Sequence, residues 1–134
     1  MLQILGLKTG GNVRRFEVLF YEKENGSIPV QEFLLSLNVK MRAKMVRTIG
    51  LLETYGNELR EPYSKYLENG IFELRSKVSS DISRVFYFFV VGQRIVITHG
   101  YIKKSQKTPK EEIERARKYR EDYLKRRAKD DDEV

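Results

Sequence analysis

The sequence predicts a single α+β domain, in which a twisted antiparallel sheet of about four strands carries an N-terminal helical hairpin and a C-terminal helix. The length of 134 residues and the hydrophobic content of 40% suit one compact domain. Apolar residues recur with a period of two in some segments and with helical spacing in others. We therefore expect one domain built from a sheet and the helices packed on it.

The two ends of the chain differ in composition from its centre. Residues 1–12 finish with two glycines and an asparagine, which predicts a flexible N-terminal extension. Residues 129–134 carry four consecutive acidic side chains and are predicted to be a disordered tail. The domain itself is expected to span 13–128.

One strand and two helices are expected before residue 57. Apolar residues alternate in 14–21, which predicts a strand with one apolar face. Pro29 suits the first position of a short helix that ends at Asn38, and Asn38 can cap the helix that follows. That helix, 39–55, has one apolar stripe at helical spacing. The stripe consists of Met41, Met45, Ile49, Leu52 and Tyr55. The two helices should form a hairpin.

Three strands are expected after a polar connection at 57–69. A two-residue type II′ loop at Gly92-Gln93 should join the second of these strands to the third, because glycine suits the first central position of that turn. The loop would fix the register and bring a cluster of side chains to one end of the sheet. In that register Phe86 lies opposite His99, Arg84 lies opposite Tyr101, and Lys103 lies diagonal to Arg84.

The last helix has a strong start signal. Thr108 and Glu111 form a capping box, and Pro109 occupies the first helical position. The apolar side of this helix is predicted to contain Ile113, Ala116, Tyr119 and Tyr123.

The composition restricts the classes of function. A net charge of +7 and a pI near 9.6 favour an acidic partner, which could be nucleic acid, an acidic protein or an anionic membrane surface. The chain has no cysteine, which excludes thiolate chemistry and fits a cytoplasmic protein. One histidine argues against a zinc site, so we expect no metal and no cofactor. No window approaches the ~20 apolar residues of a membrane span, and the N-terminus lacks a signal-peptide cleavage pattern.

Charged residues in the predicted strands are the first candidates for a site. Arg84 precedes an apolar run, so its guanidinium is expected to emerge at a strand entrance, where it could grip a phosphate. The alternative is a surface salt bridge to Glu73 or Asp81. Glu73 and Arg75 should face away from the residues that pack inward. Glu73 could accept a proton, but orienting Arg75 is favoured, because an exposed glutamate among cations is a weak base.

The histidine and three lysines are further candidates. His99 has an ordinary pKa near ~6.5, which suits acid or base catalysis, but its apolar strand also fits a structural histidine. Lys103, Lys104 and Lys107 precede a helix N-terminus, where backbone amides and the helix dipole favour anions. Together with a neighbouring arginine, they predict an anion site rather than a solvated loop.

Two tyrosines lie in the same strands. Tyr87 and Tyr101 could stack on a base or pass a proton. The alternative is that their rings fill the core and place the hydroxyl groups at its edge.

Four segments, 26–37, 71–75, 84–89 and 99–109, resemble the phage-derived HigB-like branch of the RelE/ParE toxin superfamily. The resemblance covers roughly 14–124, and its most specific part is Tyr-Ile-Lys-Lys-x-x-Lys-Thr-Pro. It implies a compact RelE-like fold and the toxin of a type II toxin-antitoxin system, an endonuclease that cleaves mRNA on the ribosome. It also implies a cognate antitoxin with a helix-turn-helix DNA-binding domain, through which alone the toxin would reach operator DNA.

Individual residues can be matched to the family. Arg84 matches its strand arginine, and Lys103 and Lys104 match the basic segment after the last strand. Glu73 and Arg75 stand where RelE has basic residues, so Glu73 departs from that pattern.

The expected chemistry is metal-independent RNA cleavage, in which the ribose 2′-hydroxyl attacks the adjacent phosphorus and the 5′-oxygen leaves. The cations would stabilise the phosphorane charge, and His99 or a tyrosine would transfer protons. The predicted catalytic residues are Arg84, Arg75, Lys103, Lys104 and His99, and the predicted RNA-binding residues are Lys107, Tyr101, Tyr87 and Glu73. Two other functions remain open: a ParE-like inhibitor of DNA gyrase without nuclease chemistry, and a passive basic RNA-binding module.

Overall fold

The computed structural model describes residues 15–103 and 107–132. The predicted N-terminal extension, 1–12, lies outside the described residues. Within the described ranges the chain forms five strands, three α-helices and one short 3-10 helix. In chain order these are β1 (Glu17–Phe20), α1 (Pro29–Ser36), α2 (Val39–Tyr55), η2 (Gly56–Glu58), β2 (Ser64–Glu68), β3 (Ile71–Val78), β4 (Asp81–Val90), β5 (Arg94–Lys103) and α3 (Lys110–Asp132).

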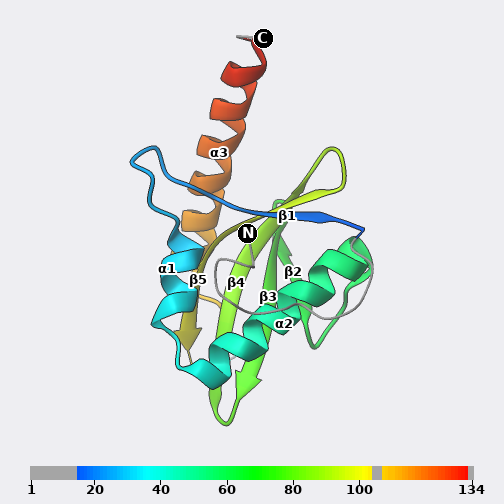
Figure 1. The fold of residues 1–134 in the computed structure, drawn as a ribbon, viewed down its shortest axis with the longest axis vertical. Helices are drawn as coiled ribbons and strands as arrows, with labels where there is room; N and C mark the ends of the chain where they lie inside the picture. Colours follow the sequence, from blue (N-terminus) through cyan, green and yellow to red (C-terminus); the bar gives the residue numbers. More distant parts are fainter. Residues whose placement is uncertain (1–14, 104–106, 133–134) are drawn as a thin grey trace.

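The sheet confirms the predicted α+β class but differs from the predicted sheet in two ways. Its strand order is β1-β5-β4-β3-β2, and β1 runs parallel to β5 while the other neighbours are antiparallel (Figure 1). The sheet is therefore mixed and has five strands. The additional strand, β2, lies inside 57–69, which the sequence predicted to be a polar connection. Lys65, Tyr66 and Glu68 are exposed on this edge strand, so it has no apolar run that would mark it.

The β4–β5 hairpin has the predicted pairing of Arg84 with Tyr101, but reaches it by another route. The loop contains three residues, 91–93, and Gly92 and Gln93 adopt positive φ angles of 90° and 57°. A register shift between Val85 and Tyr87 then compensates for the longer loop. The two-residue loop was therefore wrong, while the pairing of Arg84 with Tyr101 deduced from it was right. Phe86, predicted to lie opposite His99, falls within the register shift instead.

The register shift between β4 and β5 decides which side chains of β5 face α3. Before it, Ile95 and Ile97 belong to the core on one face of the sheet, whereas Val96 belongs to the core on the other. After it, His99 and Tyr101 share the face of Val96, and both rings stack on Phe86. The ring centroids of Phe86 and His99 are 4.8 Å apart.

The helical hairpin covers one face of the sheet and α3 covers the opposite face (Figure 1). Pro29 begins α1, and the Asn38 side chain accepts a hydrogen bond of 2.8 Å from the Met41 N–H at the start of α2, as predicted. The predicted apolar stripe of α2 is buried except for Tyr55, which is exposed.

Helix α3 lies against β3, β4 and β5 through its predicted apolar side. Ala116 is buried, and Tyr119 and Tyr123 pack against the core beneath them. The helix continues to Asp132, past residue 128, where the sequence predicted the end of the domain. Its C-terminal part extends beyond the sheet in Figure 1. Neither α3 nor any other helix of the described ranges has the length and apolar content of a membrane span.

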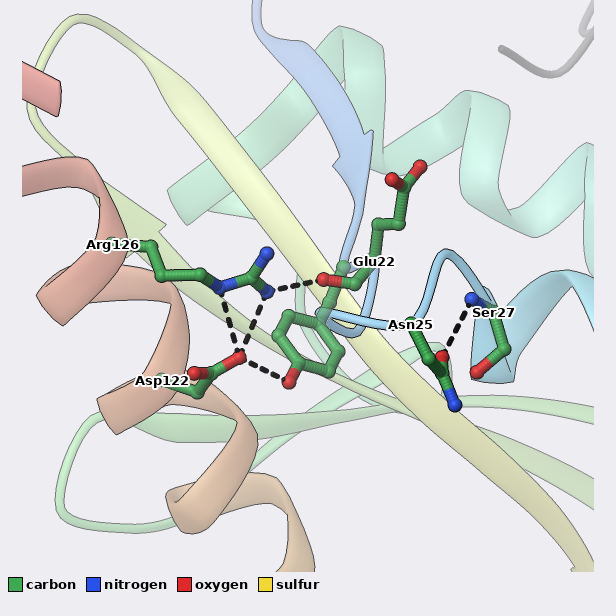
Figure 2. Close-up of polar contacts among 6 residues, drawn as sticks. Glu22, Asn25, Ser27, Asp122 and Arg126 are labelled. Atoms are coloured by element: carbon green, nitrogen blue, oxygen red, sulfur yellow. Dashed lines mark hydrogen bonds and ion pairs between the residues drawn. The ribbon is translucent and has the colours of Figure 1, made fainter.

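A polar cluster attaches the middle of α3 to the segment that follows β1. The Tyr21 hydroxyl donates a hydrogen bond of 2.6 Å to Asp122, and burial raises the Tyr21 pKa to about 12. Arg126 donates to the same carboxylate at 2.8 Å and to the Glu22 carbonyl (Figure 2). Figure 2 also shows the nearby turn, in which the Ser27 N–H donates to the Asn25 side chain.

Candidate functional site

A buried carboxylate joins three elements beside the start of α3. Glu73 on β3 has no solvent exposure. One of its oxygens, Oε1, accepts a hydrogen bond from Arg75 Nε and lies 3.4 Å from Arg84 Nε on β4. The other, Oε2, accepts a hydrogen bond from the Thr108 hydroxyl, which lies just before α3. Glu73 thus links β3, β4 and the beginning of α3.

Arg84 does not emerge at a strand entrance, as the sequence predicted, because its side chain is 0% exposed. It sits on the central strand β4, between Arg75 on β3 and Tyr101 on β5, on the face that α3 covers. Its guanidinium carbon lies 5.5 Å from the centre of the Tyr101 ring. The alternative of an ion pair with Glu73 is correct in its partner, but the pair is buried rather than at the surface.

Arg75 is the arginine of this cluster that reaches solvent, with a side chain that is 19% exposed. Glu73, Arg75 and Lys77 alternate along β3, so they share one face of the strand. Lys77 is exposed, and so is Lys107, which directly precedes Thr108. We refer to Arg75, Lys77 and Lys107 as the basic surface. Glu73 faces away from the helical hairpin, as predicted, but it is buried because the start of α3 covers it.

Of the two adjacent lysines of the predicted site, Lys103 is among the described residues and Lys104 is not. Lys103 is the last residue of β5 and pairs with Ile82, next to the turn that joins β3 to β4. The predicted role of Lys104 lies outside the described residues.

His99 occupies the environment of a structural histidine, the alternative that the sequence left open. It is 3% exposed, and its ring lies against Phe86 and at 5.5 Å from the Tyr119 ring of α3. Burial, together with the charge of Arg115, lowers its pKa to about 3. His99 is therefore neutral at pH 7, and the distance of 3.6 Å between its Nε2 and Glu112 Oε1 joins a neutral ring to a carboxylate.

The two candidate tyrosines lie on opposite faces of the sheet. Tyr101 is next to Arg84 on the α3 face, and burial raises its pKa above the ordinary value of a tyrosine. Tyr87 belongs to the core beneath the helical hairpin, where its ring stacks on Phe72 at 5.3 Å. Its hydroxyl shares a hydrogen bond with Ser64, and burial raises its pKa to about 12. Tyr87 is thus separated from the basic surface.

Sequence reasoning missed two residues of this site. Thr108 was predicted only as a helix cap, and its contact with Glu73 depends on where α3 docks. Lys77 follows Glu73 and Arg75 in the same alternation, which was a usable signal. No three potential metal ligands come together in the part of the chain that the structure describes. The charged chemistry that these residues offer is the binding of an anion by fixed cations.

A family model and a search of curated proteins give the relationships of the chain. The family described as "Phage derived protein Gp49-like (DUF891)" matches residues 32–121. The matched segment includes α2, strands β2 to β5 and the first half of α3, and with them Glu73, Arg75, Arg84 and Thr108. None of the curated proteins matches the chain.

Proposed function

The chain belongs to the Gp49-like family of phage-derived proteins, and from this membership and the geometry of its basic surface we propose that it is the toxin of a type II toxin-antitoxin system. Its activity in this proposal is ribosome-dependent, metal-independent cleavage of mRNA. The substrate is the phosphodiester backbone, which carries one negative charge per nucleotide.

The single observation that carries the proposal is that Glu73 holds Arg75 at the surface of a rigid sheet. An arginine can bind two phosphate oxygens through parallel hydrogen bonds and does not lose its charge at physiological pH. The contact with the buried carboxylate limits the rotamers of Arg75, so less entropy is lost when a phosphate binds. Exposed positive charge is added by Lys77, on the same face of β3, and by Lys107, which directly precedes the Thr108 that contacts Glu73.

In the proposed reaction the 2′-hydroxyl of a ribose attacks the adjacent phosphorus, the bond from phosphorus to the 5′-oxygen breaks, and a proton ends on that oxygen. Arg75 and the lysines, including Lys103 and Lys104, would stabilise the negative charge of the crowded phosphorane. Arg84, which is buried, would contribute to this stabilisation only through its positive charge. We assign no proton transfer to His99, because it is buried and its lowered pKa makes it a weak base. The remaining candidate for proton transfer is Tyr101 beside Arg84, which would donate its proton against a pKa that burial raises.

The proposed partners follow from the same role. A cognate antitoxin with a helix-turn-helix domain would bind the toxin, and operator DNA would be bound through that antitoxin. An acidic antitoxin surface would associate rapidly with a chain of net charge +7.

Primer extension on mRNA from cells that briefly express the chain tests the proposal. We expect new 5′ ends within translated messages, and at least about 100-fold fewer with Arg75→Ala, because removal of one preorganised donor commonly costs ~100- to 1000-fold in rate. Lys103→Ala/Lys104→Ala should also reduce cleavage. Arg47→Ala is the matched control: it removes an exposed cation from α2, on the far side of the sheet, and should leave cleavage unchanged.

Two outcomes would replace the proposal. Growth arrest with intact messages would favour the gyrase inhibitor. Neither growth arrest nor cleavage, together with salt-dependent RNA binding, would favour the passive RNA-binding module.

A further inference from the structure

The geometry points to Glu73 as a positioning residue that couples the start of α3 to Arg75. This inference rests on the proposed function and deepens it. Glu73 itself would not touch the RNA, because it is 0% exposed. Its part would be to fix where the Arg75 guanidinium points relative to Lys107 and the first turn of α3.

The two carboxylate oxygens of Glu73 have different partners, and this difference supports the positioning role. Oε1 receives Arg75 Nε and lies 3.4 Å from Arg84 Nε, whereas Oε2 receives the Thr108 hydroxyl. A carboxylate is a rigid planar group, so displacement of Thr108 from Oε2 lets the group rotate and moves Oε1 with it. The position of α3 is in this way transmitted to Arg75 through one side chain.

The charges of the cluster are compatible with an anionic ligand. Glu73, Arg75 and Arg84 together carry a net charge of +1 when all three are ionised. Arginine stays charged at all physiological pH values. The carboxylate therefore orients the guanidinium groups without cancelling the attraction between the cluster and a phosphate.

The rest of α3 is attached independently of Thr108. Glu112 and Tyr119 contact His99, and farther along Asp122 binds the Tyr21 hydroxyl. Removing the Thr108 hydroxyl should consequently leave α3 docked on the sheet and change how its first residues meet Glu73 and the Tyr101 hydroxyl, whose pKa the Thr108 side chain lowers. Because Lys107 directly precedes Thr108, the same contact also fixes the backbone from which the Lys107 side chain leaves.

Thr108→Val is the variant of choice. Glu73→Gln would also remove the carboxylate that lies 3.4 Å from the buried Arg84 Nε, and this variant could fail to fold. Valine has nearly the shape of threonine without the hydroxyl. Thr108→Ser restores the hydroxyl and serves as the conservative rescue. Thr54→Val is the matched control, since it removes the threonine hydroxyl that donates to the Gly50 carbonyl within α2.

The experiment combines two readouts on the full chain. The first is the ¹H–¹⁵N resonance of Arg75 Nε, assigned by its absence in Arg75→Lys, which reports the hydrogen bond to Glu73 whether or not RNA is cleaved. The second is kcat and KM for cleavage of ribosome-bound mRNA. We expect Thr108→Val to shift the resonance and to lower kcat about 10-fold with little change in KM, as small misplacements of a catalytic group do. Thr108→Ser and Thr54→Val should resemble the wild type in both readouts.

The outcomes separate the inference from the function on which it rests. If the wild type cleaves mRNA and Thr108→Val leaves both the Arg75 resonance and kcat unchanged, the positioning role is wrong. If the wild type does not cleave RNA, the proposed function is wrong, and the resonance alone decides whether Thr108 and Glu73 position Arg75. A lower kcat with an unchanged resonance would also overturn the inference, because the effect would then not pass through Arg75.

Discussion

Replacing Glu73 with glutamine should be among the most destabilising single substitutions in this chain. Glutamine keeps the size and most of the hydrogen-bonding capacity of glutamate, so it isolates the negative charge. Arg84 would then remain buried, at 0% exposure, without the carboxylate that now lies 3.4 Å from its Nε. A buried charge that loses its counter-ion destabilises the folded state.

The magnitude follows from the separation and burial of the two charges. At 3.4 Å and an effective dielectric constant of ~20, Coulomb's law gives roughly 5 kcal/mol. Substitutions that remove one partner of a buried pair commonly cost ~3 to 5 kcal/mol. Because the glutamine amide oxygen still accepts hydrogen bonds, we expect the lower end of this range, about 3 kcal/mol.

Urea unfolding measured by circular dichroism tests this expectation. With a denaturant dependence of about 2 kcal/mol per molar urea, the midpoint should fall by about 1.5 M. Glu68→Gln, which removes an exposed carboxylate from the edge strand β2, should shift the midpoint by less than about 0.3 M. The double variant Glu73→Gln/Arg84→Met should recover at least half of the loss, since it also removes the buried guanidinium charge that faced the Glu73 carboxylate. A midpoint for Glu73→Gln equal to that of Glu68→Gln would refute the account of a buried ion pair.

Three further predictions concern the packing of α3 and β5. The pKa of His99 is about 3 in the folded state and near ~6.5 in the unfolded state, so the unfolded chain binds more protons between these pH values. Stability should therefore fall by up to about 1.4 kcal/mol per pH unit as the pH drops through this window. Urea midpoints measured at pH 7, 6 and 5 should decline less steeply in His99→Phe than in the wild type. Gly100→Ala should lower stability by about 1 to 3 kcal/mol, because the added Cβ would lie 2.6 Å from the Arg84 carbonyl oxygen, and an unchanged melting temperature would contradict this contact. Tyr21→Phe removes the hydrogen bond to Asp122 and should cost about 1 kcal/mol, with faster proteolysis within α3 as the local readout; equal proteolysis rates would show that the bond does not hold the helix.

The sequence was sufficient for the elements whose signals are local. Pro29 and Asn38 mark helix starts through backbone chemistry that does not depend on the rest of the fold. The hydroxyl of Thr108, the predicted cap of α3, instead bonds Glu73, and that helix begins at Lys110. Strand β2 was missed because exposed residues point to both faces of this edge strand, so it has neither an apolar run nor a regular alternation. The direction of β1 could not be deduced either, since pairing with β5 is a property of the assembled sheet.

The site was predicted less well than the fold, because burial on the α3 face depends on where α3 docks. Alternation correctly placed Glu73 and Arg75 on one face of β3, but it could not show that the start of α3 covers that face. The same docking buries Arg84 and His99 while leaving Arg75 partly exposed. The helix therefore builds part of the site and covers another part.

The most direct test of the proposed activity is a reconstituted cleavage reaction. Purified chain is mixed with ribosomes that hold a defined mRNA, and the 5′ ends are mapped for the wild type, Arg75→Ala and Arg47→Ala, with a message carrying a single 2′-deoxynucleotide at the cleavage position as substrate control. We predict cleavage by the wild type and by Arg47→Ala, and little cleavage by Arg75→Ala. At the deoxy position we predict no cleavage, whether or not a chelator is added. Equal cleavage by Arg75→Ala, or cleavage at the deoxy position, would contradict an RNA nuclease that uses the 2′-hydroxyl and the basic surface.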